Sequence, residues 1–309
     1  MADLNTTSTL SPEIMTYYEK VFLARAEYEL VLDSGAQKKT HSKNSGRTIN
    51  FTRYTPLTIT TTPLGEGCNP SLSNINACTV AVTLSEYGQS TQHSKLLSLV
   101  SIDENMKEKV ELVGQQMGET LNRLTRTLAL DSGSAYYANS HTSADQAAGD
   151  TLSASAIRGM VKNLELNYAT PYSDGMFIGK TNPYSKYSLL GDTAWLNAKT
   201  YSDVKDLYRG EMGELYQVRW LLNKDALCEN GDSSTAACAV AVYSTYVHGK
   251  DAFGTMKLAG DMPKLYIIPS SNIDSANPAG RRTMISWAGT YAATLLNSSW
   301  IVRGKFTAS

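Results

Sequence analysis

The run Thr48-Ile49-Asn50-Phe51-Thr52-Arg53-Tyr54 alternates apolar and polar residues, and a second alternating run, Thr79-Val80-Ala81-Val82-Thr83-Leu84, follows it. β-Branched residues at period two are typical of β-strands. Ile49 and Phe51 fall on one face of the first strand, and Thr48, Asn50 and Thr52 fall on the other. A Gly/Pro/Asn-rich break between the runs predicts a long β-hairpin.

The segment between the two strands is rich in Thr and almost uncharged. It contains Leu57-Thr58-Ile59-Thr60-Thr61-Thr62 and then a tip of turn formers at residues 63–70. An isolated hairpin is only marginally stable in water, and the adjacent sequence offers no core to receive it. We therefore expect this arm to lie against a neighbouring subunit, which indicates an assembly protein rather than a self-contained enzyme. The candidate contact residues are its large apolar side chains: Leu57, Ile59, Leu64, Leu72 and Ile75.

Composition supports the same interpretation. Of the 309 residues, 42% are hydrophobic and 18% are charged, whereas globular proteins contain about 25% charged residues. A surface largely covered by copies of the same chain would explain this deficit. The net charge of −1 provides no basic field for tight nucleic-acid binding. No apolar stretch is as long as a membrane span, and residues 1–13 lack the apolar centre of a signal peptide. We expect no membrane partner and synthesis in the cytosol.

A long amphipathic helix is predicted from about Ile102 to Asp131, with Ser101 and Glu104 as a capping box. Its predicted core stripe recurs at steps of three and four residues: Met106, Val110, Val113, Met117, Leu121, Leu124 and Leu128. The residues expected to face away are Lys107, Glu111, Asn122 and Arg126. Gly114 and Gly118 share one helix face. They permit close approach of another backbone, or they are ordinary tolerated glycines.

The rest of the chain mixes helices and strands. A helix opens at Ser11-Pro12-Glu13. Further helices are expected at 153–168 and 183–190. Strands are expected at 175–179, 215–222, 239–247, 255–258, 264–268, 283–295 and 300–306. This mixture predicts an α+β fold.

No motif for catalysis is found. Gly179-Lys180-Thr181 has the ending of a phosphate-binding loop, but Asp174 stands where its first glycine belongs and Pro183 follows closely. A turn after a buried strand explains it better. The four histidines have no partner at metal-ligand spacing and are interpreted as surface or interface residues: His41, His93, His141 and His248. We therefore predict no enzyme activity, no cofactor, and no catalytic or metal-binding residues.

The four cysteines form two pairs with the same spacing. Cys68 and Cys78 are ten residues apart at the hairpin tip, and Cys228 and Cys238 are ten residues apart across a polar loop. Zinc sites need pairs two to four residues apart. The pairs are either free thiols with a coincidental spacing or two loop-closing disulfides, and the second interpretation is slightly favoured. Each disulfide would contribute on the order of 2.5–3 kcal/mol in the chain-entropy model.

The order of arm, hairpin, long helix, α+β unit and late strands resembles the HK-97-type major capsid proteins of tailed phages. Shorter stretches resemble the N-4-type capsid family. They are Leu10-Ser11-Pro12-Glu13 with Tyr17-Tyr18, Gly46-Arg47-Thr48-Ile49-Asn50-Phe51, Thr62-Pro63-Leu64-Gly65-Glu66-Gly67, Glu86-Tyr87-Gly88, Gly210-Glu211-Met212-Gly213-Glu214-Leu215-Tyr216 and Arg281-Arg282-Thr283-Met284-Ile285-Ser286-Trp287. The resemblance covers nearly the whole chain.

This resemblance implies an HK-97-like capsid fold in four parts. Residues 1–40 would be the N-terminal arm and helix, and residues 41–90 the extended β-hairpin loop. Residues 91–150 and 255–297 would form the peripheral domain, with the long helix as its spine. Residues 151–254 and 298–309 would form the axial domain around each capsomer centre. The loop at 270–280 would meet its counterparts at three-fold positions.

The resemblance also implies a function. The chain would self-assemble into hexamers and pentamers of an icosahedral shell around double-stranded DNA, in the cytoplasm of a bacterial host and finally in the virion. Portal, scaffolding and decoration proteins would be partners, with the scaffold a separate protein and DNA contacted non-specifically. Some members of the fold join subunits through a Lys–Asn bond whose lysine lies on the extended loop, but residues 55–91 contain no lysine. The alternatives are an α+β enzyme with an unrecognised site and a fibre or adhesin subunit.

Overall fold

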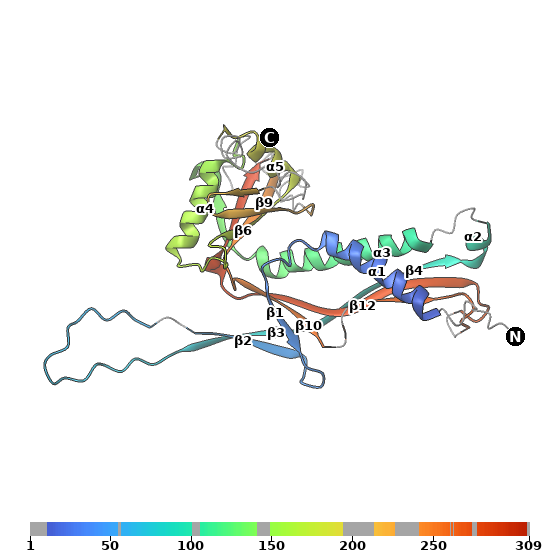
Figure 1. Ribbon diagram of the computed structural model, residues 1–309, viewed down its shortest axis with the longest axis horizontal. Helices are drawn as coiled ribbons and strands as arrows, with labels where there is room; N and C mark the ends of the chain where they lie inside the picture. Colours follow the sequence, from blue (N-terminus) through green and yellow to red (C-terminus); the bar gives the residue numbers. More distant parts are fainter. Residues whose placement is uncertain are drawn as a thin grey trace, which may run out of the picture.

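Two β-sheets, a long helix and a projecting hairpin make up the chain (Figure 1). The computed structural model describes residues 11–54, 57–100, 106–140, 149–193, 213–225, 241–259, 261, 263–273 and 277–307. The capping box predicted at Ser101 and Glu104 lies outside the described residues.

The first sheet is built around one long strand. Its strands are β1 (Gln37–His41), β4 (Ser85–Ser94), β10 (Phe253–Leu258), β11 (Lys264–Ile268) and β12 (Arg282–Leu295). β12 pairs antiparallel with β10, β11 and β4, and β1 pairs parallel with β10. Residues 284–288 of β12 pair with both β11 and β4, so these two strands lie on opposite edges of β12.

Helices α1 (Ser11–Glu29) and α3 (Met106–Thr125) share a core with this sheet, while the short α2 (Lys95–Val100) follows β4. α1 crosses α3 at the two glycines. A Cβ on Gly114 would lie 2.6 Å from the Phe22 carbonyl oxygen, and a Cβ on Gly118 would lie 2.7 Å from that of Ala26. These glycines therefore permit a close approach of two backbones, the first of the two interpretations drawn from the sequence.

The second sheet has six strands in the order β5-β13-β9-β6-β8-β7. They are β5 (Ser134–Tyr137), β6 (Phe177–Thr181), β7 (Gly213–Leu215), β8 (Val218–Leu222), β9 (Val242–His248) and β13 (Ile301–Thr307). Helices α4 (Ala154–Leu166) and α5 (Pro183–Leu190) supply Ile157, Met160 and Leu189 to its core. The strand predicted at 215–222 is split, because Tyr216 and Gln217 adopt positive φ and turn the chain between β7 and β8.

The hairpin consists of β2 (Thr48–Tyr54) and β3 (Ala77–Thr83), in antiparallel register from Thr48↔Thr83 to Tyr54↔Ala77. Its base is received by the chain itself. Phe51 and Val82 are buried in a small core with Met256 and Ala292 of the first sheet. As expected, no adjacent segment receives the hairpin; its base packs on residues that lie about two hundred positions later in the sequence.

Candidate assembly surfaces

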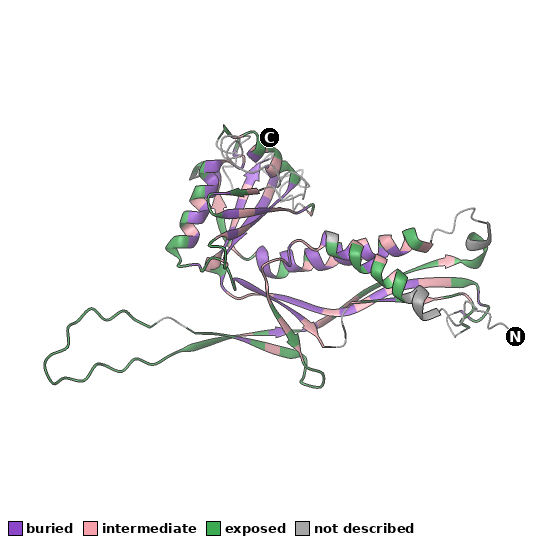
Figure 2. Cartoon of the chain, viewed as in Figure 1, coloured by how far each residue is buried: buried purple, intermediate pink, exposed green. Residues whose placement is uncertain are grey.

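The loop at the end of the hairpin extends far from the rest of the chain (Figure 1) and is exposed throughout residues 57–76 (Figure 2). The exposed fractions of its apolar side chains are large: Leu57 55%, Ile59 86%, Leu64 63%, Leu72 99% and Ile75 68%. Exposing five such side chains on one segment is costly in water. A covering surface outside this chain would remove that cost.

Cys68 and Cys78 are both exposed free thiols. Cys78 lies on β3 opposite Arg53, and Cys68 lies in the turn after Gly65. The bridge predicted between them in mature particles stays a prediction. The other predicted pair, Cys228 and Cys238, lies outside the described residues.

The predicted stripe of α3 points mainly into the core that α3 shares with α1 and the first sheet. Val110, Val113, Met117 and Leu121 are buried there, and the half-buried Met106 and Leu124 pack against the same cluster. Leu128 does not follow and is 43% exposed.

The change of phase at Leu128 has a local cause. Residues Arg126–Leu130 form a π-helical turn, closed by the Asp131 N–H donating to the Arg126 carbonyl at 2.9 Å. A π-turn holds more residues than an α-turn, so Ala129 and Leu130 take the buried positions. The prediction that Leu128 is a core residue is therefore wrong.

Asn122 and Arg126, expected to face solvent, are instead buried. The Asn122 side chain accepts from the Leu32 N–H at 2.8 Å and donates to Asn223 at 2.9 Å. Arg126 forms an ion pair with Asp225 at 2.8 Å. Hydrogen-bonded partners compensate the burial of these groups. The polar residues of the helix thus tie α3 to the segment after α1 and to the end of the second sheet.

Lys180 contacts the same segment after α1 as Asn122 does. Its position argues against the phosphate-loop interpretation. It belongs to β6, is completely buried, and its Nζ donates to the Leu32 carbonyl at 2.8 Å. The Nζ also lies 4.6 Å from the centre of the Phe253 ring. Desolvation lowers the pKa of Lys180 from 10.5 to about 7, and the charge of Asp33 partly opposes this. The lysine connects the arm to the second sheet and is not exposed to bind a phosphate.

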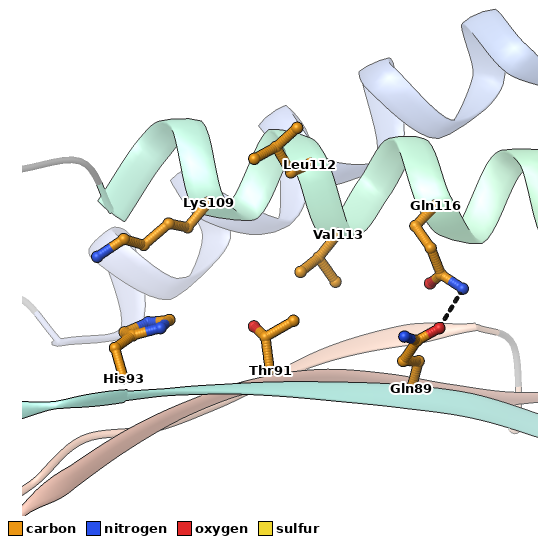
Figure 3. A pocket seen from close by; sticks show the side chains of 7 residues that line it. All are labelled: Gln89, Thr91, His93, Lys109, Leu112, Val113 and Gln116. Atoms are coloured by element: carbon orange, nitrogen blue, oxygen red, sulfur yellow. Dashed lines mark hydrogen bonds between the residues drawn. The ribbon is translucent and has the colours of Figure 1, made fainter.

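A groove lies between β4 and α3 (Figure 3). Its volume is about 220 Å³, and its lining residues come from the two elements: Gln89, Thr91 and His93 from β4, and Lys109, Leu112, Val113 and Gln116 from α3. Gln116 donates to Gln89 at 2.5 Å and accepts from Trp287 at 2.5 Å, which closes one end. Leu112 is 65% exposed at the rim.

The His93 side chain lies on the β4 side of this groove. Its Nε2 is buried and has no hydrogen-bond partner among the described residues. Desolvation and the neighbouring Lys109 charge lower the pKa of the imidazole, so the ring is neutral at neutral pH. A neutral imidazole offers one acceptor nitrogen. His93 was predicted only as a surface or interface residue, and the strand that carries it was not predicted.

The described residues contain no cluster of three His, Cys, Asp or Glu side chains able to hold a metal ion. Among them, no helix is both long and apolar enough to cross a membrane. The groove and the loop, rather than a polar catalytic constellation, are the distinctive surfaces of the described part of the chain.

Comparison with known proteins gives a consistent result at the level of structure. No family model and no curated protein matches the sequence. The capsid of Ralstonia phage GP4 is similar with a TM-score of 0.64 at 11% identity, over 90% of this chain and 89% of that one. The capsid of cyanophage P-SCSP1u is similar with a TM-score of 0.64 at 12% identity, over 91% of this chain and 89% of that one.

The capsid of cyanophage Pam1 is also similar, with a TM-score of 0.63 at 14% identity, over 91% of this chain and 93% of that one. These similarities cover about nine-tenths of each chain. The chain therefore has the HK-97-like α+β fold of phage capsid proteins.

Proposed function

We propose that this chain is the major capsid protein of a tailed phage, which self-assembles into hexamers and pentamers of an icosahedral shell enclosing double-stranded DNA. The observation that carries the proposal is the shared fold over about 90% of the chain with several phage capsids. The exposed apolar loop and the low charge content support it, since both suit a surface that other copies cover. The role is structural rather than enzymatic.

The proposed parts are those expected from the sequence: arm 1–40, extended loop 41–90, peripheral domain 91–150 with 255–297, and axial domain 151–254 with 298–309. The two sheets support this division in outline. Two strands cut across it, because β4 begins at Ser85 but pairs with β12, and β5 at Ser134–Tyr137 pairs with β13 of the second sheet. Membership of the N-4-type group stays a prediction.

The partners follow from this role. We propose copies of the same chain, a portal, a separate scaffolding protein and possible decoration proteins, with the packaged DNA contacted non-specifically. Assembly would take place in the cytoplasm of a bacterial host and end in the virion.

Negative-stain electron microscopy and analytical ultracentrifugation of the purified chain test this function. We expect closed shells, or rings of five and six subunits, in equilibrium with smaller species at high protein concentration. A species that remains monomeric at every concentration, with or without co-expressed proteins of the same phage, would contradict the proposal.

A further inference from the structure

The turn that connects β1 to β2 carries a concentration of positive charge. Between Asp33 and Glu66 the sequence contains five lysines and arginines and no carboxylate, whereas the whole chain has a net charge of −1. The five cations are Lys38, Lys39, Lys43, Arg47 and Arg53. A chain without net positive charge therefore collects a sixth of its 28 cations in one short segment.

Three of these cations lack an anionic partner in the part of the chain that the structure describes. Lys38 forms an ion pair with Asp33 at 3.0 Å, which compensates its charge. No ion pair joins Lys39, Lys43 or Arg47 to a carboxylate of the described residues. Cations without nearby carboxylates produce a local positive potential, whatever the net charge of the chain. The turn is therefore a surface that fits an anionic partner.

The turn is held in place by contacts within the chain and is open to a partner. The His41 Nε2 lies 2.9 Å from the Gly46 carbonyl oxygen, which closes the turn. Arg47 is fixed to the residue that follows β3, because its carbonyl accepts from the Leu84 N–H at 3.0 Å and its Nε donates to the Leu84 carbonyl at 2.6 Å. Residues 42–48 are all exposed, and the turn projects from the first sheet away from α3 (Figure 1).

The composition of the turn fits a phosphate backbone better than the surface of a protein. Residues 42–48 consist of two cations, small polar residues and a glycine, with no large apolar side chain. The centre of a protein interface is usually apolar or aromatic, whereas phosphate oxygens are bound by Lys, Arg, Ser, Asn and backbone N–H groups. Asn44 and Gly46 have φ of +62° and +87°, and turns of this kind can direct their N–H groups towards an anion.

We propose that the β1–β2 turn binds the phosphate backbone of double-stranded DNA through Lys39, Lys43 and Arg47. Lys39 belongs to the same surface, because its Nζ lies 3.4 Å from the carbonyl oxygen of Asn50, three residues after Arg47. The inference rests on the proposed capsid function and assigns the contact with packaged DNA to one surface, which then faces the interior of the shell. Contact of this kind is independent of base sequence and weakens with salt.

The salt dependence of DNA binding by the unassembled chain tests the contact. Three phosphate contacts give a slope of about −2.7 for the logarithm of affinity against the logarithm of salt concentration. Fluorescence anisotropy with a labelled duplex should therefore show an affinity that falls about 40-fold between about 50 and 200 mM salt. Lys39→Gln combined with Lys43→Gln should reduce the slope to about one third, because one contact remains. Circular dichroism checks that the variant folds.

The matched control removes the same charge elsewhere. Lys107 on α3 and Lys162 on α4 are exposed, and changing both to Gln should leave the slope unchanged. An equal loss in the two double variants would mean that binding follows net charge alone and would overturn the proposal. Absence of DNA binding by the wild type at about 50 mM salt would overturn it as well.

Assembly without DNA separates DNA from a protein partner. If the turn contacts DNA, the Lys39→Gln and Lys43→Gln double variant should form DNA-free shells with a yield within about twofold of the wild type. A loss of about tenfold or more would mean that the turn contacts another copy of the chain, and would overturn the proposal.

Acetylation of lysines in intact particles shows where the turn lies. Lys43 should react at least about fivefold less in DNA-filled particles than in DNA-free shells, as measured by peptide mass spectrometry, whereas Lys162 should react equally in both. Equal reaction of Lys43 in the two kinds of particle would overturn this inference alone. Failure of the wild type to form particles would overturn the capsid function instead.

Discussion

Single residues decide how the arm is attached to the second sheet. Lys180 is buried on β6 and donates to the Leu32 carbonyl, while Tyr172 donates to the carbonyl of Gly35 at 2.7 Å. Gly35 has a φ of +78°, and a Cβ there would lie 2.5 Å from the Tyr172 hydroxyl oxygen. The segment after α1 can lie this close only because it has a glycine at that point. The attachment therefore depends on a buried lysine and on a glycine in the left-handed region.

The buried lysine predicts a pH dependence of stability. Its pKa is 10.5 in the unfolded reference and about 7 in the fold, so the unfolded chain binds more protons between these values. The stability that the neutral form contributes is present above pH 10.5 and is lost as the pH falls towards 7. In urea unfolding at pH 7, 8 and 9, wild type should gain stability relative to Lys180→Met by at most about 1.4 kcal/mol per unit. The same dependence of unfolding free energy on pH in wild type and Lys180→Met would contradict this prediction.

Gly118 gives a prediction in which two effects have opposite signs. In a helix interior, Gly→Ala should stabilise by about 1 kcal/mol. Here the new Cβ would meet the Ala26 carbonyl of α1, and overpacking costs about 1–3 kcal/mol. We expect Gly118→Ala to lower the free energy of unfolding. As a control, Glu119→Ala at the exposed next position should change the free energy of unfolding by no more than about 0.5 kcal/mol. If Gly118→Ala raised the free energy of unfolding instead, the two helices would have to be able to move apart.

At the scale of elements, those with strong periodicity could be predicted from the sequence, whereas polar strands could not. The hairpin strands, α3, α4 and α5 lie close to their predicted positions, because each has a clear period or cap. β4 was missed because Gln89-Ser90-Thr91-Gln92-His93-Ser94 has no apolar alternation. β1, which is not among the strands expected from the sequence, forms because β10 provides a parallel partner. The groove between β4 and α3 could not be predicted without β4.

The π-turn at the end of α3 separates two leucines of one predicted stripe. Leu121→Ala should cost about 2–5 kcal/mol, because Leu121 is 3% exposed within the core. Leu128→Ala should cost less than 1 kcal/mol in the unassembled chain. Chemical denaturation of both variants measures the difference, and equal losses would mean that the helix stays α-helical past Thr125.

At the scale of the whole molecule, the arrangement of the parts depends on long-range contacts that could not be predicted from the sequence. The hairpin base packs on Met256 and Ala292. In the second sheet, β13 pairs with β5 on one side and with β9 on the other. These partners are far apart in the chain and share no local signal. The projecting loop was nevertheless predictable, because its uncharged, Thr-rich composition offers no local core.

Replacing residues 55–76 by Asn-Gly separates folding from assembly. This dipeptide closes a two-residue hairpin, and Tyr54, Ala77 and the buried base at Phe51 and Val82 are retained. We expect a soluble, folded chain with nearly unchanged unfolding free energy that forms no closed shells. Loss of the folded state would mean that the loop packs on its own chain.

Cryo-electron microscopy of particles formed by this chain tests the central claim most directly. We predict an icosahedral shell in which the exposed loop, residues 57–76 of each copy, lies on a neighbouring copy. A particle of another kind, or a shell in which this loop folds back on its own chain, would contradict the claim.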